Sequence, residues 1–401
     1  MNSPGFDQHP HETSAPDAGK EAYIDAVRGW AILLVITSHV GGMFPEMPYP
    51  VKKLTNFGWH GVQMFFLASA VTLLMSWNRQ SRRGLGAVRS FFVRRFLRIA
   101  PMYYMGALIY YVAEPPASDF DIAQMLRSFS FVNAWHPDWI PTTSGWMVVP
   151  GGWSIGAEFT FYALFPLLAA IVTTLHRALL FTAAAPLCAI LANRAAAVWL
   201  VGYEPAAVGN FLYFWFPNQL PVFALGFVLY FVLNRYPLPV LSRTASYGLL
   251  AVIGVVWLGA AEWPRRSSRF DSLSFAPTIL IASLSFMAFI FVLAKGADTV
   301  FAHPWIRRLG VLSFSSYVLH FLFVHQLPAW TGGLIDITAT GYSAIGMGIA
   351  LWVLTMICTT ATAVLAYKLV EQPGIDLARY LTWSRSSPMG YTGSWLSVRN
   401  G

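Results

Sequence analysis

The sequence has 401 residues, of which 56% are hydrophobic and only 11% are charged, and its net charge is +8. Because soluble domains contain about 25% charged residues, this composition excludes an ordinary soluble protein and predicts a polytopic membrane protein. The basic residues lie in short connectors between apolar runs, where they act as orientation signals in a lipid bilayer, and no nucleic-acid binding is expected.

The two ends of the chain are polar. Residues 1–20 mix Pro, His, Asp, Ser and Gly without the basic-then-apolar order of a signal peptide, so we expect a disordered cytoplasmic tail there. After Glu371, Gln372 and Pro373 the composition becomes polar again, which predicts a second cytoplasmic tail over residues 374–401. The membrane domain is therefore expected at residues 21–373.

Apolar runs of spanning length predict an all-α fold with about ten transmembrane helices. The third and fifth runs are short enough for one of them to be re-entrant. The runs lie at about 27–44, 58–77, 96–113, 152–172, 178–192, 211–233, 244–261, 274–294, 309–327 and 343–369.

The distribution of Lys and Arg predicts the orientation. If successive connectors alternate between the two sides, most basic residues, including those of the arginine-rich loop at 79–98, lie on one side. Basic connectors stay in the cytoplasm. We therefore expect both termini in the cytoplasm of a multi-pass protein of the plasma (inner) membrane.

The two cysteines do not indicate a metal site or a disulfide. Cys188 and Cys358 each lie in an apolar run, far from a second Cys or His at metal-ligand spacing. We expect no metal and no tightly bound cofactor.

An Arg and a His share one face of the first run. Arg28 and His39 are eleven positions apart, which on a helix is within about 20° of one face and roughly 16 Å along the axis. In a hydrocarbon core about 30 Å thick, Arg28 would then lie at one membrane face and His39 near mid-depth. A simpler interpretation makes Arg28 an orientation residue paired with Asp25.

Ionisable residues inside apolar runs are candidates for function, because burying a charge in the bilayer is expensive. His39 can serve as a general base, since its pKa lies near neutrality. Glu158 in WSIGAEFTFYALFPLL is expected at a similar depth, where it could accept the other imidazole N–H and orient the ring. The simpler alternative for both residues is a packing role, with His39 bonded between helices and Glu158 paired with an Arg.

A further pair of basic residues lies at the end of the arginine-rich loop. In FFVRRFLRIAPMYY, Arg95 and Arg98 fall on one helix face just before Pro101. Two guanidinium groups at the water boundary suit phosphate groups, which accept bidentate hydrogen bonds. Orientation alone would also explain them. His320, near Tyr317 in LSFSSYVLHFLF, is either structural or part of the site.

These motifs together resemble acyltransferase family 3, the bacterial transmembrane O-acyltransferases. The resemblance runs in order over most of residues 21–373, and it covers YIDAVRGWAILLVITSH, GVQMFFLASAVTL, FFVRRFLRIAPMYY, WSIGAEFTFYALFP, LSFSSYVLHFLF and the closing Glu371-Gln372-Pro373. The chain departs from the family pattern at Gln63, Ala70 and the Phe159-Thr160 pair, which bears on the acceptor more than on the chemistry.

The resemblance implies transfer of an acyl group, usually acetyl from cytoplasmic acetyl-CoA as co-substrate, to a hydroxyl of a surface or exported glycan. It implies that Arg28, Arg95 and Arg98 bind acyl-CoA and that His39 and Glu158 are catalytic. Further contacts to the oxyanion or the acceptor are expected from Trp153, Ser154, Ser313, Tyr317 and His320.

Two alternatives to glycan acylation stay open from the sequence. One is a proton-coupled secondary transporter with a His39–Glu158 relay, although transport does not require the arginine cluster. The other is an O-acyltransferase for a small secondary metabolite. The sequence does not specify the acceptor, the acyl chain, a covalent acyl intermediate or the oligomeric state.

Overall fold

A computed structural model describes residues 18–80, 85–115, 121–140, 147–262, 277–296 and 300–382, and the statements below concern those residues. The regular elements found there are helices, apart from one isolated bridge between Leu241 and Gly296. The all-α prediction is confirmed for this part of the chain.

Each predicted apolar run falls on a long helix. These helices are α1 (Ala18–Gly42), α3 (Gly61–Gln80), α4 (Leu85–Ala113), α6 (Gly152–Ile171), α7 (Leu175–Ala196), α9 (Phe216–Arg235), α10 (Arg243–Glu262), α11 (Pro277–Lys295), α13 (Ser313–Trp330) and α14 (Gly341–Ala366). Shorter helices connect or flank them: α2 (Tyr49–Phe57), η1 (Gly58–His60), α5 (Ile122–Phe129), η3 (Pro137–Trp139), η4 (Ala197–Trp199), α8 (Pro205–Phe214), η6 (Val300–Ala302), α12 (Pro304–Val311), the π-helical η7 (Tyr367–Glu371) and α15 (Gln372–Thr382).

Seven helical segments of the described chain are long and apolar enough to cross a membrane. An eighth is added if α12 and α13, whose axes differ by 76°, count as one broken span. Two predicted spans are not among them: α4, whose first half carries several arginines, and α10, which counts only as a shorter apolar helix. The protein is therefore a polytopic membrane protein with seven to eight candidate spans, against the ten expected.

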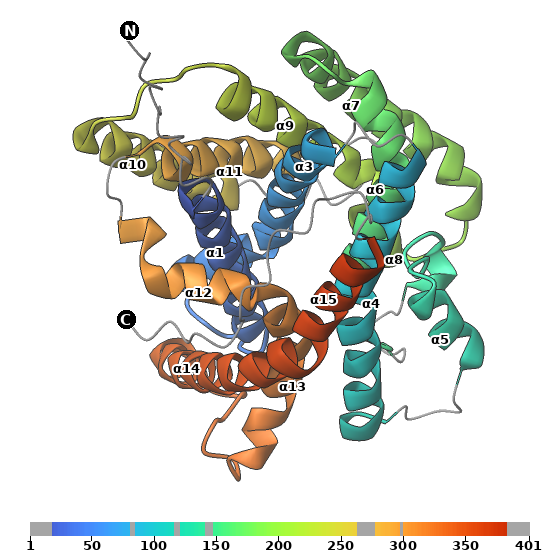
Figure 1. Ribbon diagram of the computed structural model, residues 1–401. Helices are drawn as coiled ribbons and strands as arrows, with labels where there is room; N and C mark the ends of the chain where they lie inside the picture. The colour runs from blue at the N-terminus through green and yellow to red at the C-terminus, as the bar shows by residue number, and fades with distance from the viewer. Residues whose placement is uncertain are drawn as a thin grey trace, which may run out of the picture.

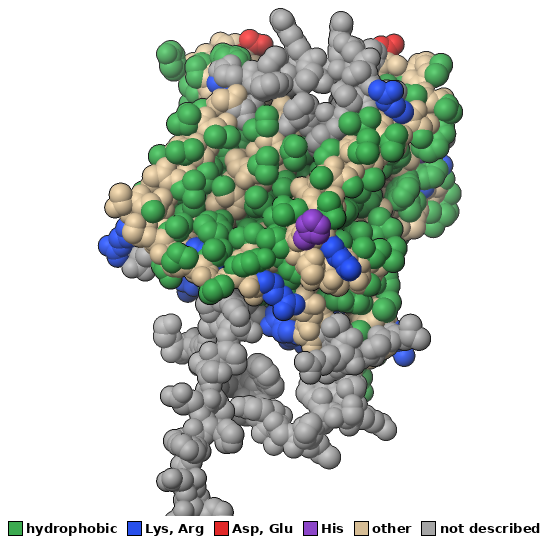
Figure 2. All heavy atoms as spheres, turned by 90° about the horizontal axis from the view of Figure 1, so that it is seen from above, with side chains coloured by type: hydrophobic (Ala, Val, Ile, Leu, Met, Phe, Trp, Pro, Cys, Tyr) green, Lys and Arg blue, Asp and Glu red, His purple; other side chains and the backbone are tan. Residues whose placement is uncertain are grey.

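Hydrophobic side chains cover much of the outer face of the bundle. In Figure 2 they fill the face between its two edges, and Lys and Arg side chains gather toward the lower edge. The exposed hydrophobic side chains include Leu167 of α6 and Leu187 of α7. Apolar side chains on the outside are what a lipid solvent requires.

Helix α1 lies inside the bundle (Figure 1), in contact with α2, α3, α11, α12, α13 and α14. Its apolar side chains Val27, Ala31, Ile32, Val35 and Ile36 are all buried. The enclosure means that the polar side chains of α1 face protein and cavities rather than lipid.

Glycines bring α1 and α12 close together. A Cβ on Gly29 would collide with the backbone of Ile306, and a Cβ on Gly310 would collide with the backbone of Asp25. Only glycine permits such an approach between two backbones. This contact holds the segment of α1 that carries Arg28.

The expected tail boundaries fall inside helices. Position 20 lies in α1, which begins at Ala18, and position 374 lies in α15, which runs to Thr382 and packs against α4. Residues 1–17 and 383–401, where most of both predicted tails lie, are outside the described residues.

We predict that Gly310→Ala destabilises the protein by about 1–3 kcal/mol, the usual cost of overpacking. The matched control is Gly254→Ala in α10, where a Cβ meets nothing within 4 Å. At that position the change replaces a residue that is unfavourable in a helix, so no loss of stability is expected. Thermal denaturation in detergent measures both variants, and equal midpoints would contradict the proposed packing.

Candidate active site

Three adjacent cavities lie along the inside of the bundle. The first, called the arginine pocket, has a volume of about 260 Å³ and is lined by Asp25, Arg28, Arg79, Arg95 and Arg98. The second, called the neck, has about 80 Å³ and shares Arg28, Arg95 and Arg98 with the first. The third, called the histidine cavity, has about 370 Å³ and includes His39. Val62 and Tyr317 line both the neck and the histidine cavity.

The arginine pocket gathers the three predicted donor-binding arginines. Arg28 comes from α1, whereas Arg95 and Arg98 lie three residues apart on α4. The guanidinium of Arg95 also lies 5.9 Å from the ring centres of Phe91 and Tyr162. Several cations on one wall of a pocket make it suitable for an anion such as phosphate.

A buried carboxylate holds Arg98 in place. Glu371, only 1% exposed, lies 3.9 Å from Nη2 of Arg98 and accepts a 2.7 Å hydrogen bond from the Ser315 hydroxyl. It belongs to η7, a π-helical turn between α14 and α15. π-helical turns are often found at functional sites, and here the turn carries the carboxylate beside the basic pocket.

Glu158 lies in the neck, where its Oε1 accepts hydrogen bonds from two hydroxyls. Tyr162, one turn further along α6, donates over 2.6 Å, and Ser69 of α3 donates to the same oxygen. The carboxylate is also within electrostatic range of Arg28 and Arg95. It therefore offsets positive charge at the point where the arginine pocket narrows.

His39 lies in the last turn of α1 and is surrounded by rings. Its ring centre is 4.2 Å from that of Phe321, 5.3 Å from that of His320 and 6.3 Å from that of Trp59. His320 is fully buried, and its Nδ1 lies 2.7 Å from the carbonyl oxygen of Tyr317. His39 thus lines the histidine cavity, and the ring of His320 lies buried beside it.

Hydroxyl groups lie where the neck meets the histidine cavity. The hydroxyls of Ser154 and Tyr317 are 2.8 Å apart, and the Tyr317 hydroxyl donates to the carbonyl of Gly151 over 3.0 Å. Gly151 caps α6 with φ of 75°, a backbone conformation that favours glycine. Trp153 lines the histidine cavity, and Ser313 lines the neck.

The structure does not bring Glu158 to His39. No hydrogen bond joins them in the described part of the chain, and they line different cavities. The reason is that α6 directs Glu158 toward α3 and α4, whereas His39 lies near the end of α1 beside α13. The expected orientation of His39 by Glu158 is therefore corrected: the ring of His320, rather than the Glu158 carboxylate, lies beside that of His39.

Three residues of this arrangement were not singled out as site residues by the sequence. Ser69 and Tyr162 hold Glu158, and Glu371 holds Arg98. A signal was present for Glu371, because a carboxylate directly after a long apolar run is costly without a partner. Ser69 and Tyr162 gave no such signal, since hydroxyl side chains are common in transmembrane helices.

These cavities match a ligand with three different parts. A polyanionic end suits the arginine pocket, a narrow flexible chain suits the neck, and an uncharged group suits the aromatic histidine cavity. The reacting atoms would meet near Tyr317, where hydroxyls can stabilise an oxyanion and an imidazole can take a proton.

We predict that Glu158→Gln lowers the free energy of unfolding by about 1.5–3 kcal/mol, because the two hydroxyls then donate to a neutral amide oxygen and lose the extra strength of a bond to a charged acceptor. It also removes one of the carboxylates that offset the charge of Arg28 and Arg95. Adding Arg95→Met to this variant should restore part of the loss, whereas Arg95→Met alone should not stabilise the protein. Thermal denaturation of the three variants measures the coupling, and purely additive effects would contradict it.

Comparison with known proteins agrees with this geometry. The sequence profile of the acyltransferase domain of acyltransferase family 3 matches residues 21–368. Acyltransferase MdmB of Streptomyces mycarofaciens is 25% identical over 378 residues, which are 88% of this chain and 91% of the relative. Exopolysaccharide production protein ExoZ of Rhizobium meliloti is 25% identical over 335 residues, 79% of this chain and 90% of the relative.

Nodulation protein 10 of Rhizobium leguminosarum bv. viciae is 23% identical over 347 residues, which are 82% of this chain and 85% of the relative. No solved structure matches the chain. The profile match covers most of the sequence and all the residues that line the three cavities, from α1 to α13. The chain belongs to acyltransferase family 3, a family of membrane acyltransferases.

Proposed function

We propose that the protein transfers an acyl group, acetyl in the first instance, from cytoplasmic acyl-CoA to a hydroxyl of a cell-surface or exported glycan. One observation carries this proposal. A pocket lined by Arg28, Arg95 and Arg98 leads through a neck to a cavity that contains His39. The positive-inside distribution of basic residues supports cytoplasmic termini and a donor that enters from the cytoplasm.

The donor would lie along the first two cavities. The phosphates of CoA would bind the guanidinium groups of the arginine pocket, which can form bidentate hydrogen bonds to phosphate oxygens. The narrow, uncharged pantetheine arm would then pass through the neck beside Glu158 and Ser154. This placement brings the thioester to the Tyr317 end of the neck.

The acceptor would occupy the histidine cavity. Aromatic side chains form much of its wall, including Trp59, Trp153, Tyr213 and Phe214, and two amides, Asn133 and Asn210, supply hydrogen bonds. Its described lining contains no Asp, Glu, Lys or Arg. A volume of about 370 Å³ is at the low end for ligand pockets, which suits one part of a larger glycan. The name of ExoZ, an exopolysaccharide production protein, supports a glycan acceptor.

The chemistry requires one proton to move. His39 would take the proton of the acceptor hydroxyl while the hydroxyl oxygen forms a bond to the carbonyl carbon of the thioester. The hydroxyls of Ser154 and Tyr317 would stabilise the oxyanion. The carbon–sulfur bond then breaks, the electron pair leaves with sulfur, and the proton held by His39 passes to the CoA thiolate. Direct transfer and an acyl group carried by His39 are both consistent with this placement.

We predict that His39→Ala abolishes acyl transfer in membranes while the protein stays in the membrane, because the base is lost. The matched control is His176→Ala, on the exposed start of α7. Transfer is measured as radiolabelled acetyl incorporated into surface glycan, and protein amount by immunoblot. Acetylated product at the normal level from the His39 variant would contradict the assignment.

We predict that Arg95→Ala and Arg98→Ala each weaken acetyl-CoA binding about tenfold or more, since a charge-assisted hydrogen bond is worth about 1.5–3 kcal/mol. The control is Arg235→Ala at the exposed end of α9. Titration calorimetry on protein in detergent provides the affinities. Unchanged titration curves for both variants would contradict donor binding and would leave these arginines only the role of setting the orientation of the protein in the membrane.

The acceptor and the acyl group are identified by mass spectrometry of surface glycans from cells with and without the gene. We expect an acetyl mass increment on a glycan only in cells that carry the gene. A mass increment confined to a secreted small molecule would instead support the secondary-metabolite alternative, and no change in either fraction would contradict the acyltransferase proposal.

A further inference from the structure

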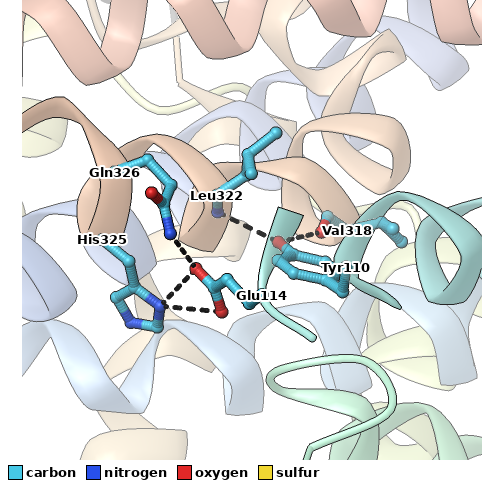
Figure 3. Close-up of polar contacts among 6 residues, drawn as sticks. All are labelled: Tyr110, Glu114, Val318, Leu322, His325 and Gln326. Atoms are coloured by element: carbon cyan, nitrogen blue, oxygen red, sulfur yellow. Dashed lines mark hydrogen bonds and ion pairs between the residues drawn. The ribbon is translucent and has the colours of Figure 1, made fainter. Parts of the chain in front are cut away.

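Tyr110 of α4 bonds to the backbone of α13 in the turn that carries His320 (Figure 3). Its hydroxyl donates to the carbonyl of Val318 over 2.8 Å and accepts the amide N–H of Leu322 over 3.1 Å. In a regular helix these two groups, four residues apart, pair with each other. Tyr110 is 1% exposed, so this contact lies inside the protein.

A second contact lies one turn further along both helices. Glu114, just after the end of α4, accepts hydrogen bonds from Nδ1 of His325 over 3.2 Å and from the amide of Gln326 over 3.1 Å. Figure 3 shows both contacts on the same side of α13. Two polar contacts one turn apart set the rotation of α13 about its axis as well as its height against α4.

His320 lies between the two backbone groups that Tyr110 joins. Because the carbonyl of Tyr317 can only accept a hydrogen bond, the 2.7 Å contact places the ring proton of His320 on Nδ1. Nε2 then carries a lone pair. It is buried and has no hydrogen-bond partner among the described residues, a state that usually costs about 1–3 kcal/mol. The ring of His39 is 5.3 Å away, centre to centre.

We propose that Tyr110 is a positioning residue that fixes the α13 turn so that the unpartnered Nε2 of His320 is available to accept the ring N–H of His39, a hydrogen bond that is not formed in the structure, where the ring centres are 5.3 Å apart. His320 thereby takes the orienting part first expected of Glu158, and it leaves the other nitrogen of His39 free to act as the base. This inference rests on the proposed role of His39, but the arrangement of the two rings is testable without any acyl transfer.

Nitrogen-15 NMR of histidine-labelled protein in detergent micelles, without substrate, tests the proposal. His39→Gln and His320→Gln assign the two rings. In the unmodified protein we expect His320 to carry its proton on Nδ1. Tyr110→Phe lets Val318 and Leu322 pair only with each other, so we expect the ring nitrogen signals of both His39 and His320 to shift.

The matched control is Tyr104→Phe, which removes a hydroxyl that donates to the carbonyl of Phe129 over 2.9 Å on the same helix. It should leave both histidine signals in place. 4-Aminophenylalanine at position 110, which keeps a donor and an acceptor, should restore the unmodified spectrum.

Two results would overturn the proposal. One is unchanged histidine signals in a folded Tyr110→Phe variant. The other is a proton on Nε2 of His320 in the unmodified protein, a result that does not depend on whether any variant folds. If Tyr110→Phe lost acyl transfer but left these spectra unchanged, Tyr110 would contribute to the proposed function in another way, and the positioning role would be wrong.

Discussion

Charged groups inside a membrane protein must find their partners within the protein, because lipid offers none. Here the cations come from α1 and α4, and the carboxylates that offset them come from α1 itself, through Asp25, and from α6 and η7. The three arginines can therefore remain inside the bundle only when these separate elements pack together. Because the charged side chains need polar surroundings, the helices leave a polar space around them. This space is the arginine pocket.

The charge is confined to one end of the path. Arginines and carboxylates line the arginine pocket and the neck, whereas aromatic rings, amides and the imidazole of His39 line the described part of the histidine cavity. A ligand with a charged end can stay anchored while its uncharged reactive end advances. In a site shielded from water, a hydroxyl or an imidazole aimed at a developing charge has a larger effect than it would in water.

Much of the fold was predictable because lipid imposes a simple rule on sequence. Apolar runs of about 20 residues must be helices, and each predicted run falls on a long helix. The count of clear spans is lower because α4 carries charge, α10 counts only as a shorter apolar helix, and the bend before α13 breaks the pattern. The sequence could also predict that Arg28 lies near the arginines of α4, since all of them are expected at the cytoplasmic side of the membrane.

Side-chain partners were less predictable, because they depend on helix rotation. Glu158 and His39 were expected at similar depths, but depth does not determine which face of α6 meets which helix. Packing of α6 against α3 and α4 directs Glu158 to Ser69. The ring of His320 lies beside that of His39 because α13 packs against α1. Such contacts between segments far apart in the chain leave no periodic signal in either one.

The central claim is that one continuous path joins the arginine pocket to the histidine cavity. Photo-crosslinking tests it directly, with an acyl-CoA analogue that carries a diazirine at the end of its acyl group, followed by peptide mapping of the purified protein. The account predicts labelling on α3 and α13, which supply Val62 and Tyr317, and its loss when excess acetyl-CoA competes. Labelling confined to lipid-facing residues of α7 or α10, or unaffected by acetyl-CoA, would contradict it.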